Sequence, residues 1–231
     1  MIRADRGLSN HSYRIKKMKT LLSALAIATA AFLPLVAQAT IVTSSSGLAS
    51  HDNLVTFSNP SLAADTIVTN QYAAEGLTFS ALNGGAVRAN SCGINAWNGI
   101  SGLSGDTLNT YGPRCSTNGV NDSFSMLFAN SVSAASFGFY NFGSNVLTAL
   151  LNGNLVQSFA LGSGTSGYVN FTNMVFNEIR FTEAFTQSGY LTFDNVASVN
   201  AVPEPTTVAL LGLGLIGVIA SRRKSAKNKN A

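Results

Sequence analysis

The sequence predicts an all-β fold, a jelly-roll-like β-sandwich, between an N-terminal signal helix and a single C-terminal transmembrane helix. From Ile41 to Asn200 the chain is rich in Gly, Ser, Thr and Asn, and it shows no sustained helical repeat. Short stretches of alternating or β-rich composition recur along this segment, with Gly and Asn turns between them. Roughly 160 residues are enough to bury one core between two sheets.

We expect nine strands, each a short apolar or β-branched stretch between turn signals. They are Leu54–Ser58, Gly76–Ala81, Ser123–Ala129, Ala134–Phe142, Val146–Leu151, Leu155–Leu161, Gly167–Thr172, Val175–Thr182 and Tyr190–Val199. Asn152-Gly153 tolerates the positive φ values of a type I′ turn and predicts a hairpin.

Side-chain parity predicts which residues share a face of each strand. Phe137 and Phe139 should face one way, whereas Tyr140 and Phe142 face the other. In the strand at 175–182, the residues expected on one face are Val175, Ile179 and Phe181, and those expected on the other are Phe176, Glu178 and Arg180.

The charges divide the 231-residue chain into three parts: 1–39, 40–200 and 201–231. The net charge is +4, but most basic residues lie near the two ends. Between Thr40 and Ala201 there are three arginines and eight acidic residues, which gives this segment a net charge of −5. A surface of this sign repels phosphate backbones, so we expect no nucleic-acid partner.

Residues 1–39 are predicted to be an N-terminal extension and a signal peptide. Leu21–Val36 is apolar, and Ala37 and Ala39 are the small residues that a signal peptidase needs at its cleavage site. The positive residues before the apolar run are Lys16, Lys17 and Lys19. We expect the initiator to be Met18 and the mature chain to begin at Thr40. The alternative is a membrane anchor.

Export changes how the two cysteines are interpreted. In an oxidising compartment, Cys92 and Cys115 are expected to form a disulfide. A metal site is the poorer interpretation, because neither cysteine has a second Cys or a His at ligand spacing. The surrounding segment Gly84–Gly119 is rich in glycine, so we predict a long loop region closed by this bridge.

The chain ends in three consecutive elements. Val202-Pro203-Glu204-Pro205 is stiff and extended, because each proline fixes φ. Thr206–Ser221 has no charge and predicts a transmembrane helix at about 206–221. Arg222, Arg223 and Lys224 follow it and should stay on the cytoplasmic side.

This tail resembles the PEP-CTERM sorting signal, which has the same three elements in the same order. The resemblance implies that an exosortase recognises Pro203, Glu204 and Pro205 and cuts near them, while the basic cluster stops transfer. It also implies a route through the inner membrane to the cell surface or extracellular matrix of a Gram-negative bacterium. The alternative is an ordinary single-span anchor with a proline-rich linker.

The segment 40–200 is similar, less closely, to the jelly-roll-like domains that PEP-CTERM proteins often carry. The residues concerned are Asn70-Gln71-Tyr72, Glu75-Gly76-Leu77-Thr78-Phe79 and Leu191-Thr192-Phe193-Asp194-Asn195-Val196. In relatives an acidic residue often follows the first strand phenylalanine. Here Phe57 is followed by Ser58, which puts a ligand role at that position in doubt.

The sequence offers few candidate catalytic residues. His51 and Asp52 lack a nucleophile elbow to complete a triad. Glu178 and Glu183 are five residues apart, which places them on opposite faces of a strand rather than as facing carboxylates. We therefore expect no enzyme and no cofactor. Asp194-Asn195 could supply oxygens to a structural calcium, although no second carboxylate is evident.

Three functions were compared. The first is a non-enzymatic surface or biofilm-matrix protein, and the second is a carbohydrate-binding module that retains the producer's exopolysaccharide. The third, a glycosidase or esterase, is disfavoured by the missing acid–base pair. For the second function Trp97 is the candidate ligand contact, in a platform with Tyr72, Tyr111 and Tyr140, since aromatic faces suit the apolar faces of sugar rings.

Overall fold

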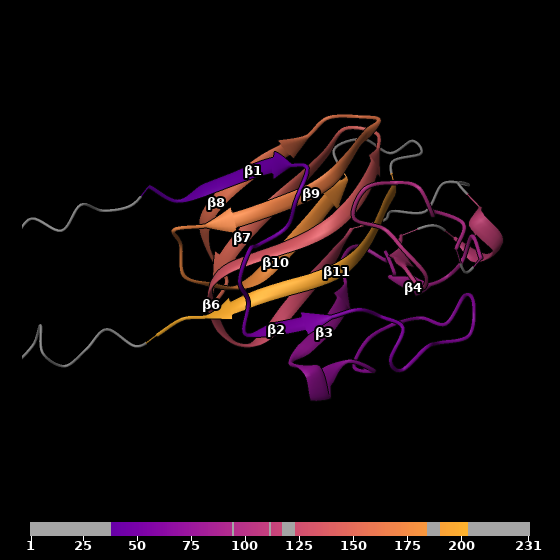
Figure 1. Cartoon of the computed structure of the whole chain (residues 1–231), viewed down its shortest axis with the longest axis horizontal. Coiled ribbons are helices and arrows are strands. Elements are labelled where there is room, and N and C mark those ends of the chain that lie inside the picture. The colour runs from indigo at the N-terminus through magenta and orange to yellow at the C-terminus, as the bar shows by residue number, and fades with distance from the viewer. Residues whose placement is uncertain (1–37, 94, 111, 117–122, 184–189, 203–231) are drawn as a thin grey trace, which may run out of the picture. The chain divides into compact units, whose positions relative to one another are not determined.

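The computed structural model describes residues 38–93, 95–110, 112–116, 123–183 and 190–202 (Figure 1). These residues form strands and two single-turn 3-10 helices, so the predicted all-β class is confirmed. In the described ranges, no helix is long and apolar enough to cross a membrane. The predicted signal helix and the predicted transmembrane helix at about 206–221 lie outside those ranges.

Eleven strands make up the described part of the chain. They are β1 Thr40–Ser44, β2 Asn53–Val55, β3 Leu77–Ala81, β4 Arg88–Ala89, β5 Leu108–Asn109, β6 Phe124–Phe142, β7 Asn145–Leu151, β8 Asn154–Leu161, β9 Thr165–Thr172, β10 Phe176–Glu183 and β11 Tyr190–Asn200. The 3-10 turns are η1 Ala73–Glu75 and η2 Pro113–Cys115. Each predicted segment overlaps a strand, whereas β1, β4 and β5 have no predicted counterpart. β4 and β5 have two residues each, too few to show a period.

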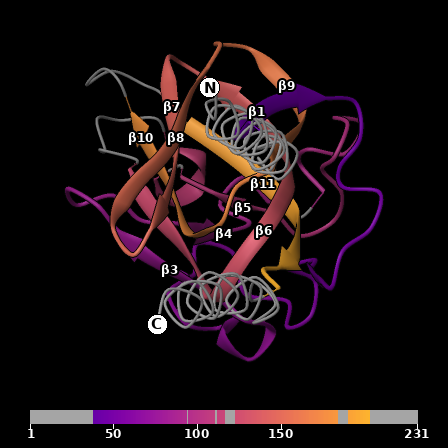
Figure 2. The same ribbon diagram turned by 90° about the vertical axis from the view of Figure 1, so that its left-hand side faces the viewer.

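The longest strand, β6, belongs to both layers of the sandwich. From Phe124 to Phe128 it pairs with β3, and it pairs with β10 between Phe124 and Val132. It pairs with β11 from Val132 and with β9 from Ala135. Layer 1 is therefore β3–β6–β10–β7–β8, and layer 2 is β5–β11–β6–β9–β1 with β2 also on β11. Figure 2 shows β7, β8 and β10 on one side and β1, β9 and β11 on the other.

The prediction of two separate strands at 123–129 and 134–142 is wrong, because β6 runs through both. Ala129 and Asn130 are exposed, as in a turn. However, the stretch between the two segments has no Gly or Pro to reverse the chain. The strand continues and exchanges its partners, β3 and β10 for β11 and β9.

Phenylalanines from both layers fill the core. Phe193 of layer 2 stacks on Phe124 of layer 1 with ring centroids 5.4 Å apart. Phe171 and Phe176 meet across the layers at 5.6 Å. Burying each such side chain contributes about 1.5–3 kcal/mol. The fully buried phenylalanines are Phe57, Phe137, Phe139, Phe171, Phe176, Phe181 and Phe193. The prediction that Phe137 and Phe139 share one face of β6 is therefore confirmed, and that face is the inward one.

Strand β10 departs from the predicted alternation at its start. Ile179 and Phe181 face the core as predicted, but Phe176 is also fully buried, and Val175 is 45% exposed. The pairing of β10 with β6 shifts register between Phe176 and Glu178. A shift of this kind changes which residues share a face, so a period of two cannot be extended across it.

The predicted hairpin at Asn152-Gly153 is confirmed, and it joins β7 to β8. The two residues have φ values of 52° and 80°, as a type I′ turn requires. Leu151 and Asn154 pair on either side of the turn.

In the part of the chain that the structure describes, regular structure begins at Thr40 and ends at Asn200. Just before it, Ala39 packs against the core. Just after it, the backbone N–H of Ala201 donates a hydrogen bond to the carbonyl oxygen of Ser131 at 2.9 Å. Among the described residues, this is the last hydrogen bond between the C-terminal end of β11 and the sandwich, and Val202 follows it.

Candidate functional site

The outer face of layer 2 carries most of the polar and aromatic residues that the sequence singled out. Residues paired directly across antiparallel strands lie on the same face, so the register arranges side chains in rows. One row consists of Asn109, Thr192, Tyr140 and Ser166. The next row consists of Asp194, Gly138, Tyr168 and Ser44.

A loop closed by a disulfide lies over this face. The sulfurs of Cys92 and Cys115 are bonded, with the Cα atoms 4.5 Å apart, which confirms the predicted pairing. Between them the backbone touches β6, because a Cβ atom added to Gly138 would lie 2.7 Å from the Cα of Gly102 and closer still to its carbonyl oxygen. The amide of Asn195 also donates to that carbonyl, at 3.1 Å. We call residues 95–105 of this disulfide-closed segment the covering loop; β5 follows it and belongs to layer 2.

Four aromatic rings gather beside the covering loop. Trp97 stacks on Tyr140 with ring centroids 5.5 Å apart, and Tyr190 stacks on Phe142 at 5.1 Å. The rings of Tyr140 and Tyr190 are 6.1 Å apart. We call these four residues the aromatic cluster. Phe142 is 43% exposed and the other three are partly exposed, so the cluster reaches the surface.

Only half of the predicted aromatic platform is at this face. Trp97 and Tyr140 belong to the aromatic cluster, but Tyr72 is a core residue that is 1% exposed. Its hydroxyl donates to the carbonyl oxygens of Phe57 and Pro60 at 2.9 and 3.0 Å. Burial, followed by the charge of nearby carboxylates, raises the pKa of Tyr72 to about 12. The fourth predicted member, Tyr111, lies outside the described residues.

Asp194, proposed above for calcium with Asn195, anchors the covering loop instead. Its carboxylate accepts hydrogen bonds from the Ser104 backbone at 3.2 Å and from the backbone and side-chain nitrogens of Asn195 at 2.6 and 3.0 Å. Three donors thus occupy oxygens that a cation would need, and calcium takes about six to eight. Among the described residues, no three His, Cys, Asp or Glu side chains form a group that could hold a metal. The geometry gives the calcium hypothesis no support.

The stability of the domain should depend on the proton of Asp194. Burial is the main cause that raises the pKa of Asp194 from 3.8 to about 6, and the charge of Asp106 adds to it, against the hydrogen bonds from Asn195 and Ser104. As pH rises from about 4 to about 6, the unfolded chain loses this proton while the folded chain keeps it. The free energy of unfolding should therefore fall by about 3 kcal/mol over this range, at about 1.4 kcal/mol per pKa unit.

Urea unfolding at several pH values measures this decline, and the variant Asp194→Asn should lack it. An unchanged decline in the variant would assign the effect to another group. Glu178 acts in the opposite sense around its ordinary value of 4.5, because its lowered pKa makes stability rise with pH. This effect is the same in the wild type and in Asp194→Asn, so the difference between the two isolates Asp194.

The carboxylates considered for catalysis are held in other interactions. Burial disfavours the charged form of Glu178, but hydrogen bonds from Arg180 and Ser125 outweigh it and lower the pKa of that carboxyl. An acid that an arginine keeps ionised is unsuited to donate a proton to a leaving group. Asp52, proposed beside His51, accepts a hydrogen bond from the backbone of Asn200 at 2.8 Å and is thereby tied to β11.

Two shallow hollows lie on the same face as the aromatic cluster. One has a volume of about 300 Å³ and is lined by Thr43, Ser44, Ser45, Ser101, Ser166 and Gly167. We call it the hydroxyl hollow. The other, of about 270 Å³, has His51, Tyr168 and Asn195 among its lining residues. Both open beside the covering loop, to which Ser101 belongs.

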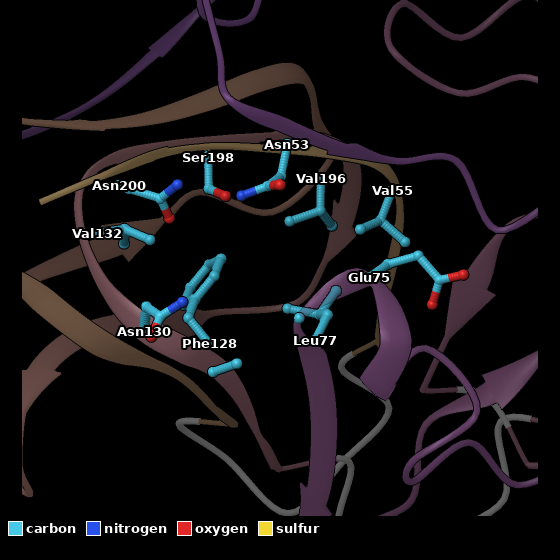
Figure 3. Close-up of a pocket in the computed structure, with 12 residues that line it drawn as sticks. Asn53, Val55, Glu75, Leu77, Phe128, Asn130, Val132, Val196, Ser198 and Asn200 are labelled. Atoms are coloured by element: carbon cyan, nitrogen blue, oxygen red, sulfur yellow. The ribbon is translucent and has the colours of Figure 1, made fainter.

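A third cavity lies between the layers and is much smaller (Figure 3). Asn53, Ser198 and Asn200 form one wall, and Leu77 and Phe128 form the opposite wall. Its volume of about 30 Å³ is enough for a water molecule or two. Ligand pockets commonly measure about 300–1,000 Å³, so this cavity is an internal gap and not a binding site.

The sorting residues predicted from the sequence lie outside the described ranges. They are Pro203, Glu204, Pro205, Arg222, Arg223 and Lys224, and Ala37 of the predicted cleavage site lies outside as well. Residues 201–224 match the PEP-CTERM protein-sorting motif, so the predicted resemblance is confirmed.

These observations define a class: an exported protein in which an all-β domain precedes a PEP-CTERM sorting motif. The motif implies targeting to an exosortase, with a transient stay in the membrane and export to the cell surface. No curated protein matches the chain.

Solved structures give only low similarity. A family 29 carbohydrate-binding module in complex with cellulohexaose has 14% identity and a TM-score of 0.30, over 60% of this chain and 92% of that one. An adhesin domain of Lys-gingipain from Porphyromonas gingivalis has 11% identity and a TM-score of 0.36, over 72% and 100%. A family 11 carbohydrate-binding module of a Clostridium thermocellum cellulase has 13% identity and a TM-score of 0.31, over 63% and 99%. At these sequence identities and TM-scores, neither the ligands nor the activities of those proteins can be assigned to this chain.

Proposed function

We propose that this chain is a non-enzymatic protein of the cell surface or extracellular matrix, delivered by an exosortase that acts at residues 203–205. The observation that carries the proposal is the match of residues 201–224 to the sorting motif. On this proposal, residues 1–39 are removed by a signal peptidase, residues 40–200 are the domain that is delivered, and residues 201–231 are the sorting signal.

The end of the folded domain supports this assignment. Ala201 is still bonded to the backbone of Ser131, but the next residue, Val202, is 83% exposed. Only Val202 therefore stands between the sandwich and Pro203. A membrane-embedded protease that cut near the motif would leave β11 and all its partners intact. The delivered domain would keep its whole core.

Replacing Pro203, Glu204 and Pro205 together by alanine tests the proposal in the producing bacterium. Membrane insertion should persist, because the apolar run and the basic cluster are unchanged. Processing should fail, and full-length protein should accumulate in the inner membrane, as measured by fractionation and immunoblotting. A double alanine variant of Thr206 and Thr207 is the matched control and should be processed normally. Delivery of the triple variant to the matrix without residues 206–231 would refute the proposal.

A second candidate function, carbohydrate binding, is favoured by the aromatic cluster. Trp97 and Tyr140 stack on each other, and both rings remain partly exposed to solvent. Flat aromatic surfaces of this kind suit the apolar faces of sugar rings. A glycan array probed with the full chain should show binding that Trp97→Ala removes. Binding to no glycan, or binding unchanged by the substitution, would reject this candidate.

A further inference from the structure

We propose that the hydroxyl hollow and the aromatic cluster form one binding site for a neutral polysaccharide chain. This inference rests on the carbohydrate-binding candidate and deepens it, since it adds the second half of the site and the chemical class of the ligand. It does not depend on how the protein is sorted.

The strand register makes the two features continuous. Ser166 lines the hydroxyl hollow, and in the pairing of β6 with β9 it lies directly opposite Tyr140 of the aromatic cluster. Directly paired residues on antiparallel strands have their Cβ atoms about 4.5–5.5 Å apart on the same face. The hollow therefore begins beside Tyr140, so one extended ligand can contact both.

The two halves offer the two interactions that a sugar chain needs. The aromatic cluster supplies ring faces for stacking. The hollow is lined by five serine and threonine residues in all, and a hydroxyl group can both donate and accept hydrogen bonds as a sugar hydroxyl does. The hydroxyl of Ser44 is already bonded to Ser46 and to the amide of Asn170. Three segments contribute the five residues: Thr43–Ser45 at the end of β1, Ser101 of the covering loop and Ser166 of β9. Its volume of about 300 Å³ lies at the lower end of the range for ligand pockets.

The charge pattern favours a neutral ligand over an acidic one. From Ser123 to Asn177, a segment that includes β6, β7, β8 and β9, the sequence has no charged residue and no histidine. No residue that lines the hydroxyl hollow is charged. Carboxylate ligands are commonly held by Arg or Lys. None of the domain's three arginines lines the hollow. Arg180 is paired with Glu178 on layer 1, the guanidinium of Arg88 donates to the carbonyl of Asp65 at 3.0 Å, and Arg114 lies in η2. A domain of charge −5 would also repel a polyanion.

Affinity electrophoresis of the full chain in mild detergent tests this inference. The gels contain a neutral β-glucan, a neutral galactomannan or the acidic polymer polygalacturonate. At least one neutral polymer should retard the protein, and polygalacturonate should not. Ser166→Val fills the hollow and removes a hydroxyl beside Tyr140, so it should weaken binding about tenfold, the loss expected for one good hydrogen bond. The matched control is Ser158→Val, an exposed serine on β8 of layer 1, which should bind as the wild type does.

Each other outcome overturns the inference. Retardation by polygalacturonate alone would contradict the ligand class, and wild-type binding by Ser166→Val would exclude the hollow. If Ser166→Val fails to fold, Ser45→Val repeats the test in an exposed segment of the same hollow. Retardation by no polymer would remove the carbohydrate site altogether while the sorting experiment still succeeded. The two proposals can therefore fail separately.

Discussion

Replacing Gly138 by alanine should destabilise the domain by about 3 kcal/mol, at the upper end of the usual cost of overpacking. The added Cβ would lie within 2.7 Å of three backbone atoms of Gly102, and backbone cannot rotate away as a side chain can. The covering loop must therefore move away from β6 to make room for the added methyl group. Trp97 is the single tryptophan and stacks on Tyr140 of the same strand, so its fluorescence should report this movement in the folded protein.

Gly162→Ala is the matched control for this variant. A Cβ atom there would meet only the side chain of Thr165, at 3.3 Å, which can give by a few tenths of an ångström. Urea unfolding should find the control close to the wild type. If Gly138→Ala unfolded at the same urea concentration and kept the wild-type emission, the covering loop could not lie on β6 as described.

Removing the disulfide by the double substitution Cys92→Ser and Cys115→Ser should cost about 3 kcal/mol in the chain-entropy model. The bridge closes a loop with a sequence separation of 23, so its loss mainly gives the unfolded chain more freedom. In the folded state, the bonds of Asp194 and Asn195 to Ser104 and Gly102 still hold the loop. The Trp97 emission of the folded variant should therefore remain native, which distinguishes this variant from Gly138→Ala.

A reductant provides the internal control for the disulfide. Adding dithiothreitol should shift the urea midpoint of the wild type toward that of the double variant and should leave the variant unchanged. A wild type that is insensitive to complete reduction, or a double variant of full stability, would contradict the structural role assigned to the bridge.

The strands and the disulfide could be predicted because their signals are local. Alternation within six to ten residues reveals a strand, and Asn152-Gly153 reveals a turn without reference to any other part of the chain. The disulfide could be predicted from two facts alone: the domain has two cysteines, and the chain carries an export signal. The same local signals wrongly divided β6 in two, because Asn130 is polar and looks like a turn residue. That β11 becomes the new partner of β6 at Val132 is a long-range feature, which a local pattern does not show.

The candidate site was harder to predict because distant segments form it. Tyr190 meets Phe142 only through the pairing of β11 with β6, and Gly102 meets Gly138 only because the covering loop lies on the sheet. Parity did place Tyr140 and Phe142 together on the face opposite Phe137 and Phe139, which was the available signal for the aromatic cluster. Nothing local identified Ser166, since an exposed strand serine looks the same whether or not it lines a hollow.

The measurement that tests the sorting proposal most directly is the intact mass of the protein released from the cell surface, with sequencing of both ends. The mature protein should begin at Thr40, and it should lack residues 206–231 after cleavage near Pro203, Glu204 and Pro205. A peptide from Thr206–Ser221 in the surface fraction would show that the tail is a plain anchor. An N-terminus at Leu21 or earlier would show that the predicted signal peptide is not removed.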